Sequence, residues 1–171
     1  MDLSLPVNAI PINELNRLEN LRDYKILDTK PGTTFNHLSS GLAVFYDVPI
    51  SQINFVDQNR VWTISNQVGE TITHPDRSMS LCTRAIESKD ITVYEDTWQV
   101  KEIENNPFVK GTPPIRFYAA APITTAEGYN IGVVCIVDFK PRSFSKEKLH
   151  QLAVIANMVK GMLEKRLEVW D

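Results

Sequence analysis

Hydrophobic residues recur every three or four positions in two early segments of the chain, which is the spacing of an amphipathic helix. The first segment predicts a helix over about 13–27, since Asn13 is a residue type that often caps a helix. Its hydrophobic stripe consists of Leu15, Leu18 and Leu21. The second segment predicts a helix over about 33–46, with the stripe Phe35, Leu38, Leu42 and Phe45. Both helices are expected to pack one side against a core.

Runs of hydrophobic residues in the middle of the chain predict β-strands. The expected ranges are 51–65 for a first hairpin, 81–88 for a short helix, 91–96 for a single strand, and 115–125 with 129–139 for a second hairpin. Segments 66–77 and 97–114 are polar with Gly and Pro breaks, so we expect loops there, the first as a candidate lid. Because no βαβ alternation appears, this order predicts an α+β fold with a central antiparallel sheet.

A long helix is expected over about 145–169, and it carries more hydrophobic surface than one face needs. Its two neighbouring stripes are Leu152, Ile155, Val159, Met162 and Val169, and Leu149, Ala153, Ala156, Leu163, Leu167 and Trp170. One stripe can pack on the sheet, whereas the other would need either the N-terminal helices or a partner helix. The partner alternative predicts a symmetric homodimer through the terminal helices, with an interface formed by Leu15, Leu18, Val159 and Met162.

Three consecutive alanines, Ala119, Ala120 and Ala121, occupy the middle of an expected strand, where larger residues are usual. Alternation places Arg116, Tyr118 and Ala120 on one face of the sheet, and Ala119 and Ala121 on the other. Since a guanidinium facing a packed core would need a partner, the Arg116 face is expected to be open to a ligand. Ala120 would then form the floor of a cavity, unless the alanines instead make room for a tryptophan side chain.

The chain of 171 residues has the length of one domain, so we treat 1–171 as a single domain. Its net charge of -3 and its scattered Lys and Arg residues argue against nucleic-acid binding. No hydrophobic run reaches the length of a membrane-spanning helix and no signal peptide is recognisable, so we expect a cytoplasmic protein without a membrane contact. The two cysteines, Cys82 and Cys135, are too few for a disulfide scaffold and are expected to be thiols.

Four segments resemble GAF domains and occur in that family's order. They read INFVDQNRVWTISNQVG, RSMSLCTRAI, NPFVKGTPPIRFYAAAPI and IGVVCIVDFKPRSFS. The resemblance extends from about residue 13 to residue 167, and it is to the subtype found in bacterial sensor histidine kinases and cyclic-dinucleotide signalling proteins. It implies a central antiparallel sheet, a helical layer on one face that is often used for dimerisation, and a loop-covered small-molecule pocket on the other face.

The sequence lacks features of several known GAF subtypes, and these differences argue against the corresponding functions. Bilin-binding members usually have a histidine soon after their attachment cysteine, whereas Cys82 is followed by Thr83 and Arg84, so we expect no covalent chromophore. The signature of members that bind cyclic nucleotides is not found in order. Methionine-sulfoxide-reductase members need clustered cysteines, and the two in this chain lie on different expected elements. The three histidines show no metal-ligand spacing, so no metal site is expected.

The resemblance and the strand pattern together nominate a ligand site. Its candidates are Phe55, Trp62, Cys82, Asp96, Phe108, Arg116, Tyr118 and Ala120. The four aromatic residues would be either pocket walls or plain core. Asp96 and Arg116 would either bind a polar ligand or form an ion pair with each other. Cys82 opens a short helix and would be either a reactive thiol or a small core residue.

These expectations favour a non-catalytic sensory or regulatory module in signal transduction, in which an unidentified small molecule alters the terminal helices. The signalling output would lie in another protein or in another domain of a longer chain. Two alternatives stay open: a small redox enzyme of the free methionine-sulfoxide-reductase type that uses Cys82 and Cys135, and a dimerisation scaffold with a filled, ligand-free pocket. Nothing in the sequence identifies the ligand or a cofactor.

Overall fold

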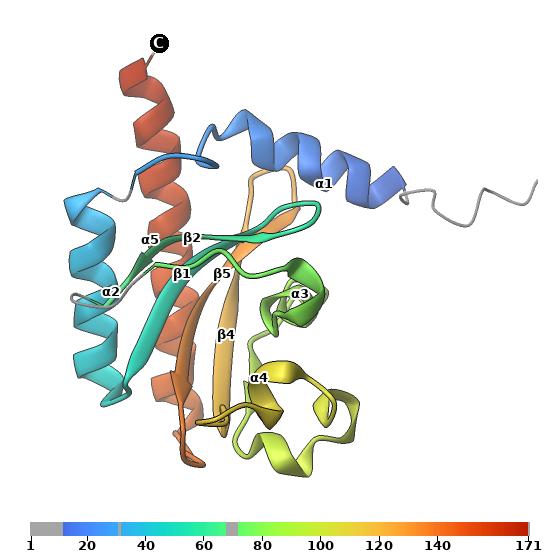
Figure 1. The fold of residues 1–171 in the computed structure, drawn as a ribbon. Coiled ribbons are helices and arrows are strands. Elements are labelled where there is room, and N and C mark those ends of the chain that lie inside the picture. Colours follow the sequence, from blue (N-terminus) through green and yellow to red (C-terminus); the bar gives the residue numbers. More distant parts are fainter. Residues whose placement is uncertain (1–11, 31, 68–71, 171) are drawn as a thin grey trace, which may run out of the picture.

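The structure, a computed structural model, describes residues 12–30, 32–67 and 72–170. Within them, five strands form one antiparallel sheet in the order β2-β1-β5-β4-β3, which confirms the expected α+β fold (Figure 1). The helices are α1 (Ile12–Asp23), α2 (Thr33–Tyr46), α3 (Cys82–Ala85), α4 (Pro107–Lys110) and α5 (Lys146–Trp170). The strands are β1 (Ile50–Val56), β2 (Val61–Asn66), β3 (Thr92–Tyr94), β4 (Phe117–Thr124) and β5 (Asn130–Asp138). The connections include the 3-10 turns η1 (Arg77–Met79), η2 (Thr97–Gln99) and η3 (Lys101–Ile103).

The first helix is shorter than its hydrophobic pattern predicts. α1 ends at Asp23 rather than near residue 27. Lys25 and Asp28 follow it with left-handed backbone conformations, at φ of 51° and 59°, which a right-handed helix cannot include. α1 lies across the end of the sheet where the turns of both hairpins lie (Figure 1). After α1 ends, the chain turns toward α2.

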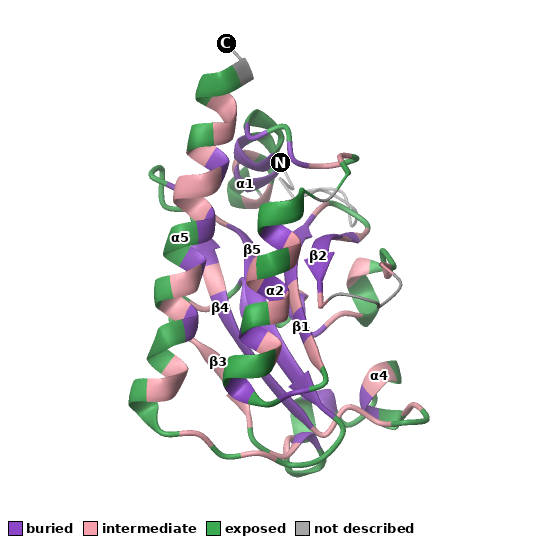
Figure 2. Cartoon of the chain, turned by 90° about the vertical axis from the view of Figure 1, so that its left-hand side faces the viewer, coloured by how far each residue is buried: buried purple, intermediate pink, exposed green. Residues whose placement is uncertain are grey.

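α2 and α5 lie side by side over one face of the sheet, as Figures 1 and 2 show from two directions. The Tyr46 hydroxyl at the end of α2 donates a hydrogen bond of 2.7 Å to the carbonyl oxygen of Lys148 at the start of α5. The core beneath these helices includes Leu42, Tyr46, Ile53, Phe55, Phe117, Ile136, Leu152, Val159 and Leu163. This layer is the helical face that the sequence predicts.

The alanine run in β4 allows α5 to lie close to the sheet. Ala119 and Ala121 are fully buried in the same core as Leu152, Ala156 and Val159 of α5. Because a methyl side chain projects little above the strand, the backbone of β4 and the helix can approach each other without leaving a void. The expectation that Ala119 and Ala121 face the helices is confirmed.

The opposite face of the sheet is covered by α3, α4 and the loops around them (Figure 1). A second hydrophobic cluster lies there, and it includes Leu81, Cys82, Ala85, Ile86, Ile103, Val109, Tyr118, Ala120, Cys135 and Val137. Ala120 pairs with Cys135 on β5 and with Thr92 on β3, and it is fully buried in this cluster. Both faces of β4 and β5 are therefore shielded from water, which explains why neither strand alternates between polar and hydrophobic residues.

The residues that we expected at a dimer interface do not lie together on the surface. Leu18 and Val159 are buried in the core of the chain, and Met162 is partly buried against it. Leu15 is exposed. Leu18 and Val159 are needed within one chain because each fills the space between its helix and the sheet, so neither is available to a partner. The described helices include none that is both long enough and apolar enough to cross a lipid bilayer.

Gly132 in β5 marks a very close approach between β5 and β1. A Cβ atom at this position would lie 2.2 Å from the carbonyl oxygen of Asn54 and 2.9 Å from Cδ1 of Phe55. The pairing of β1 with β2 shifts register between Ile53 and Asn54, and this irregularity lies beside the contact. Only glycine fits at position 132 without moving β1.

We predict that Ala119→Leu lowers the free energy of unfolding by about 1–3 kcal/mol, because three added carbon atoms must be placed between β4 and α5. Urea denaturation followed by circular dichroism measures the change. Ala126→Leu is the control, since Ala126 is exposed in the β4–β5 turn, and it should change the stability by less than about 0.5 kcal/mol. Equal effects of the two substitutions would show that the contact between α5 and β4 is not tightly packed.

Candidate functional site

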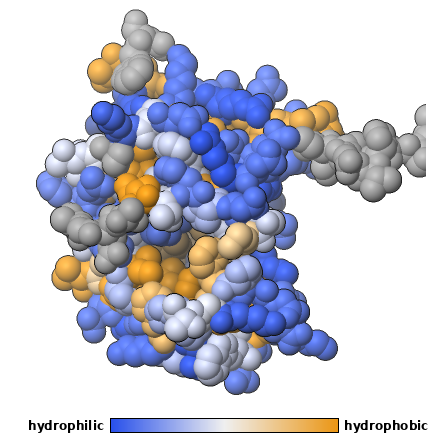
Figure 3. Space-filling view, viewed as in Figure 1, coloured by the Kyte–Doolittle hydropathy of each residue, from blue (hydrophilic) through white to orange (hydrophobic). Residues whose placement is uncertain are grey.

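A cavity of about 380 Å³ lies over the face of the sheet opposite to α2 and α5. Strands β1, β2, β4 and β5 supply its floor, and its cover comes from the segments around η1, α3 and α4. On the face seen in Figure 3, hydrophobic residues gather in the lower half, within a largely hydrophilic surface. The main floor residues are Gln52, Asn54, Thr63, Tyr118, Cys135 and Val137, and the cover includes Pro75, Ser80, Leu81, Cys82, Phe108 and Ile115.

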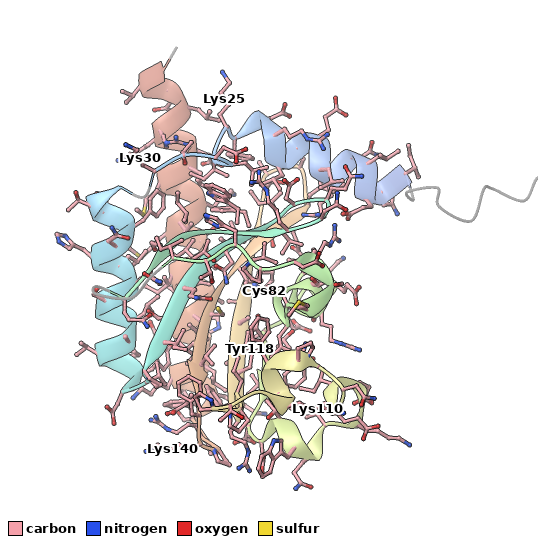
Figure 4. The ribbon with its side chains drawn as sticks, viewed as in Figure 1. Lys25, Lys30, Cys82, Lys110, Tyr118 and Lys140 are labelled. Carbon is pink, nitrogen blue, oxygen red and sulfur yellow. The ribbon has the colours of Figure 1, made fainter. Side chains whose placement is uncertain are left out.

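Four polar side chains from four different elements meet in this cavity. The Tyr118 hydroxyl donates a hydrogen bond of 3.3 Å to Sγ of Cys82, and Figure 4 shows these two side chains next to each other. Nδ2 of Asn54 lies 3.4 Å from Sγ of Cys82 and 3.7 Å from Sγ of Cys135, and it also donates to Oε1 of Gln52 at 3.1 Å. The Asn54 amide therefore bridges two thiols that belong to α3 and β5.

The surroundings of the two thiols push their pKa values apart. The hydrogen bond from Cys135, opposed by burial and helped by bonds with Ser80, Tyr118 and Asn54, lowers the pKa of Cys82 to about 6. The same hydrogen bond, together with burial and the charge of Cys82, raises the pKa of Cys135 well above its ordinary value. Of the two sulfur atoms, Cys82 is the one that carries the negative charge when the pair loses its first proton.

One polar atom on the cavity floor has no hydrogen-bond partner. Asn54 is only 2% exposed, and its Oδ1 atom is buried and unpaired. Leaving a buried amide oxygen without a partner costs on the order of 1–3 kcal/mol. Because Asn54 also lines the cavity, this unpaired acceptor lies close to the space that a bound molecule would occupy.

Apart from Cys82, whose pKa is lowered to about 6, no ionisable acid or base of the usual charged types lines this cavity in the part of the chain that the structure describes. Its lining there contains hydroxyl, amide, thiol and hydrocarbon groups, but no Asp, Glu, Lys, Arg or His. Nor do the described residues contain a group of three or more His, Cys, Asp or Glu side chains that could hold a metal ion. This arrangement disfavours an anionic ligand, because no cationic side chain on the described walls would balance its charge and the Cys82 thiol itself ionises to an anion.

The GAF domain model matches residues 24–161 of this chain, which is most of its length. The chain belongs to the GAF domain family. It is 32% identical over 132 residues to the cyclic di-GMP phosphodiesterase PA2567 of Pseudomonas aeruginosa, a match that covers 77% of this chain and 22% of that protein. The chain thus spans about a fifth of the length of this relative.

Solved structures share the GAF fold at low sequence identity. The GAF domain of an Acinetobacter phosphoenolpyruvate-protein phosphotransferase superposes with a TM-score of 0.64 at 12% identity, and the match covers 94% of this chain and 98% of that one. A type II free methionine-R-sulfoxide reductase from Thermoplasma acidophilum superposes with a TM-score of 0.62 at 16% identity, covering 91% and 96%. At such identities the likeness shows the fold alone.

The structure of this GAF domain brings three of the predicted site residues to the cavity, namely Cys82, Phe108 and Tyr118. Ala120 lies on the same face of the sheet but is covered by protein, so it is not a free floor position. Phe55 is buried on the helical face, beneath α2 and α5. Ala120 and Phe55, although both are candidates from the sequence, therefore do not line the cavity.

The remaining candidates lie outside the cavity. Arg116 and Asp96 form an ion pair of 3.0 Å, and the Arg116 guanidinium carbon lies 3.6 Å from the ring centroid of Trp98. Of the two alternatives for Asp96 and Arg116, the structure shows the pairing. Trp62 pairs across the hairpin with Phe55, so it points to the helical side, where its ring stacks on His74 at 3.7 Å between centroids. None of these residues lines the cavity.

Sequence reasoning missed Asn54, and it considered Cys135 only as part of a redox enzyme. A signal for Asn54 exists, because it is a polar residue between Ile53 and Phe55 in an otherwise hydrophobic run. Alternation puts such a residue on the face opposite to its two hydrophobic neighbours. No pattern in the sequence predicts that Cys82 and Cys135 line the same cavity, because this depends on how the segment before α3 folds over the sheet.

The cover of the cavity is linked to the N-terminal helix by charged side chains. Both Arg17 of α1 and Arg77 of η1 donate hydrogen bonds to the carboxylate of Glu14, and the Arg17 contacts are 2.8 Å long. Arg77 also donates to the carbonyl oxygen of Asp57 at 3.1 Å. Burial alone would raise the pKa of Glu14, but the two arginines lower it to about 2. The start of the cover is thereby attached to α1.

We predict that Glu14→Gln lowers the free energy of unfolding near neutral pH. It should also reduce how steeply that free energy falls in acid. The pKa of Glu14 is about 2 in the folded chain against a reference of 4.5, so its carboxylate stabilises the fold above pH 4.5. That contribution is lost as the pH falls from 4.5 toward 2. Urea unfolding at a series of pH values should therefore show a shallower decline for Glu14→Gln over this range. Glu19→Gln, an exposed position on the same helix, is the matched control for the change of charge.

If Glu14→Gln and the unmodified protein lose stability in parallel between pH 4.5 and pH 2, the bridge to Arg77 does not stabilise the fold.

Proposed function

We propose that this GAF domain is a non-catalytic sensory or regulatory module that binds a small, uncharged molecule in the cavity over β1, β4 and β5. The observation that carries the proposal is the unpaired Oδ1 atom of Asn54, a buried acceptor in the wall of a cavity of about 380 Å³. This volume falls within the range of small-molecule pockets, which are mostly apolar with a few placed polar groups.

The chemistry of the walls indicates what such a molecule would present. Its N–H or O–H group would donate to Oδ1 of Asn54, and its apolar part would lie against residues of the cover such as Leu81 and Phe108. An anionic ligand would lose its hydration without gaining a counter-charge from the described lining residues, and a cation would find only the one sulfur atom of Cys82. We therefore expect a compact neutral molecule with at least one hydrogen-bond donor.

The named activity of the relative suggests the output rather than the ligand. PA2567 is a cyclic di-GMP phosphodiesterase, and most of its length lies outside the match to this chain. Cyclic di-GMP carries two phosphate charges, for which the described cavity lining offers no Arg or Lys side chain. We propose that this domain regulates a cyclic-dinucleotide signalling output, in the same chain or in a partner, and does not itself bind that nucleotide.

We predict that Asn54→Leu weakens ligand binding by roughly three- to tenfold, the range expected when one neutral hydrogen bond is lost. A library of neutral small molecules would be screened by thermal shift, and the affinities of the hits measured by calorimetry. Leu removes the unpaired acceptor but also the amide donor that contacts Gln52, Cys82 and Cys135, so the melting temperature of the ligand-free protein is measured in parallel and the affinities are compared where both proteins are folded. Asn157→Leu, on the exposed side of α5, is the control and should leave the affinities unchanged.

Two outcomes would argue against the proposal. One is a set of hits whose affinities do not change in Asn54→Leu. The other is stabilisation by cyclic di-GMP that equals or exceeds that of every neutral compound.

A second candidate function is reduction of free methionine sulfoxide, because the structure brings Cys82 and Cys135 to one cavity although they lie on different elements. Thiol-dependent turnover of free methionine sulfoxide is its direct test. Either function is expected in the cytoplasm, where a reducing environment would keep both cysteines as thiols.

We also propose that the domain forms a homodimer through the outer surface of α2 and α5. Hydrophobic side chains are exposed there although both helices already cover the sheet: Val44, Phe45, Val154 and Met158, of which Val44 is 81% exposed. The Tyr46–Lys148 hydrogen bond joins the two helices, which lie side by side on this face of the domain (Figure 2). A second copy of the same surface would cover them across a two-fold axis.

We predict that replacing Val154 and Met158 together with Glu converts a dimer into a monomer, because like charges would meet across the axis. Sedimentation velocity at tens of micromolar protein gives the oligomeric state. Asn157→Glu lies on the same helix at an exposed position outside this hydrophobic pair and should leave the dimer intact. A monomeric unmodified protein, or a dimer that tolerates both Glu residues, would contradict the proposed interface.

A further inference from the structure

The two cysteines of the chain line the same cavity and contact the same side chain, that of Asn54. Cys82 is 3% exposed and Cys135 is 1% exposed, both are free thiols, and both line the cavity. The Asn54 amide contacts both sulfur atoms, at 3.4 Å from Sγ of Cys82 and 3.7 Å from Sγ of Cys135. The chain has no other cysteine, so either thiol can pair within the molecule only with the other.

We propose that Cys82 and Cys135 are a hydroperoxide-responsive thiol pair that closes to a disulfide in the wall of the cavity and thereby alters the ligand site. The oxidant would be a hydroperoxide, either hydrogen peroxide or an organic hydroperoxide. It would reach the sulfur atoms through the cavity, because the surrounding protein otherwise buries them. This activity goes beyond ligand sensing and does not depend on which ligand the cavity holds.

The first step oxidises Cys82. Its thiolate attacks an oxygen atom of the hydroperoxide, the O–O bond breaks, and the sulfur atom becomes a sulfenic acid. The proton that Cys82 loses is transferred to the departing oxygen, which leaves as an alcohol or as water. The Tyr118 hydroxyl, 3.3 Å from Sγ of Cys82, is placed to donate to this oxygen while the O–O bond breaks and to regain the proton that Cys82 gives up.

The second step joins the two residues. The sulfur atom of Cys135 attacks the oxidised sulfur atom of Cys82, the S–O bond breaks, and the released hydroxide takes the proton of Cys135 to form water. In total, two thiols and one hydroperoxide give one disulfide, one alcohol or water molecule, and one further water molecule. Two electrons pass from the thiol pair to the peroxide, so no other co-reactant is required.

The order of attack follows from the different surroundings of the two sulfur atoms. Four neighbouring groups, from Cys135, Ser80, Tyr118 and Asn54, make hydrogen bonds that lower the pKa of Cys82 to about 6, even though burial acts in the opposite direction. Cys135 has its pKa raised. The thiolate is the nucleophile that attacks the peroxide, so Cys82 reacts first, and Cys135, which keeps its proton until the second step, resolves the sulfenic acid.

Closure of the disulfide would change the cavity in two ways. It would tie α3, which belongs to the cover, to β5 in the sheet. It would also remove the thiolate that accepts hydrogen bonds from Tyr118 and Asn54, and both donors would then be available to the cavity. A ligand bound over the sulfur atoms would in turn shield them from the oxidant.

The direct experiment uses the unmodified protein. After reduction and removal of the reductant, it is treated with one equivalent of hydrogen peroxide or cumene hydroperoxide and followed by intact-mass spectrometry and thiol titration. We expect the loss of two hydrogen atoms, a fall from two titratable thiols to none, a Cys82–Cys135 cross-link in peptide maps, and full reversal by dithiothreitol. Oxidation should be half-maximal near pH 6, where Cys82 becomes a thiolate.

Three variants assign the roles of the residues. Cys135→Ser should stop at the sulfenic acid, which dimedone traps on Cys82, whereas Cys82→Ser should not react with dimedone after the same treatment. Tyr118→Phe keeps the ring but removes the hydroxyl, and it should slow the oxidation by about tenfold, as expected for the loss of one hydrogen bond to a charged group. The pH midpoint of the Tyr118→Phe reaction should also rise, which a purely structural role of Tyr118 would not cause.

Three results would overturn the proposal. The first is oxidation of each cysteine on its own, to sulfinic acid, without a cross-link in the unmodified protein. The second is a disulfide that forms only between chains. The third is catalytic turnover of free methionine sulfoxide by the same pair at a higher rate than reaction with either hydroperoxide, because the pair would then serve an enzyme rather than a switch.

Discussion

The close contact between α5 and the centre of β4 decides how the rest of this GAF domain is arranged. Ala119 and Ala121 allow the helix to lie against the strand, and the long side chains of the core, such as Phe117 and Leu152, fill the space beside them. Once this face of the sheet is occupied, any ligand site must form on the other face. Because Ala119 and Ala121 let α5 occupy one face of the sheet, the cavity lies on the other face.

Much of the fold could be predicted from hydrophobic spacing alone, because the period of two in a strand and of 3.6 in a helix is set by backbone geometry. Alternation in β4 correctly separated Ala119 and Ala121 from Tyr118. It was less informative in β1, where both faces are buried and hydrophobic character no longer distinguishes them. Phe55 was a candidate for either a pocket wall or plain core, and the structure shows core, whereas the neighbouring Asn54 lines the cavity.

Contacts that depend on the path of a loop could not be predicted. Cys82 meets Cys135 only because the segment from residue 72 to α3 crosses the sheet at this point, and no periodic pattern encodes that path. The surface of α5 is a related case. Two hydrophobic stripes were visible in the sequence, but only the packed structure shows that Val159 is internal whereas Val154 and Met158 are external.

Gly132 has a consequence for which side chains the floor of the proposed ligand site can carry. Its missing side chain leaves room for the carbonyl oxygen of Asn54, so any substitution at position 132 displaces the backbone that carries the Asn54 amide. A residue that lines no part of the cavity therefore limits which residues can replace its floor. In protein engineering, the specificity of this pocket is best redesigned with position 132 held as glycine, and the cover, whose backbone is independent of this contact, offers the greater freedom for new side chains.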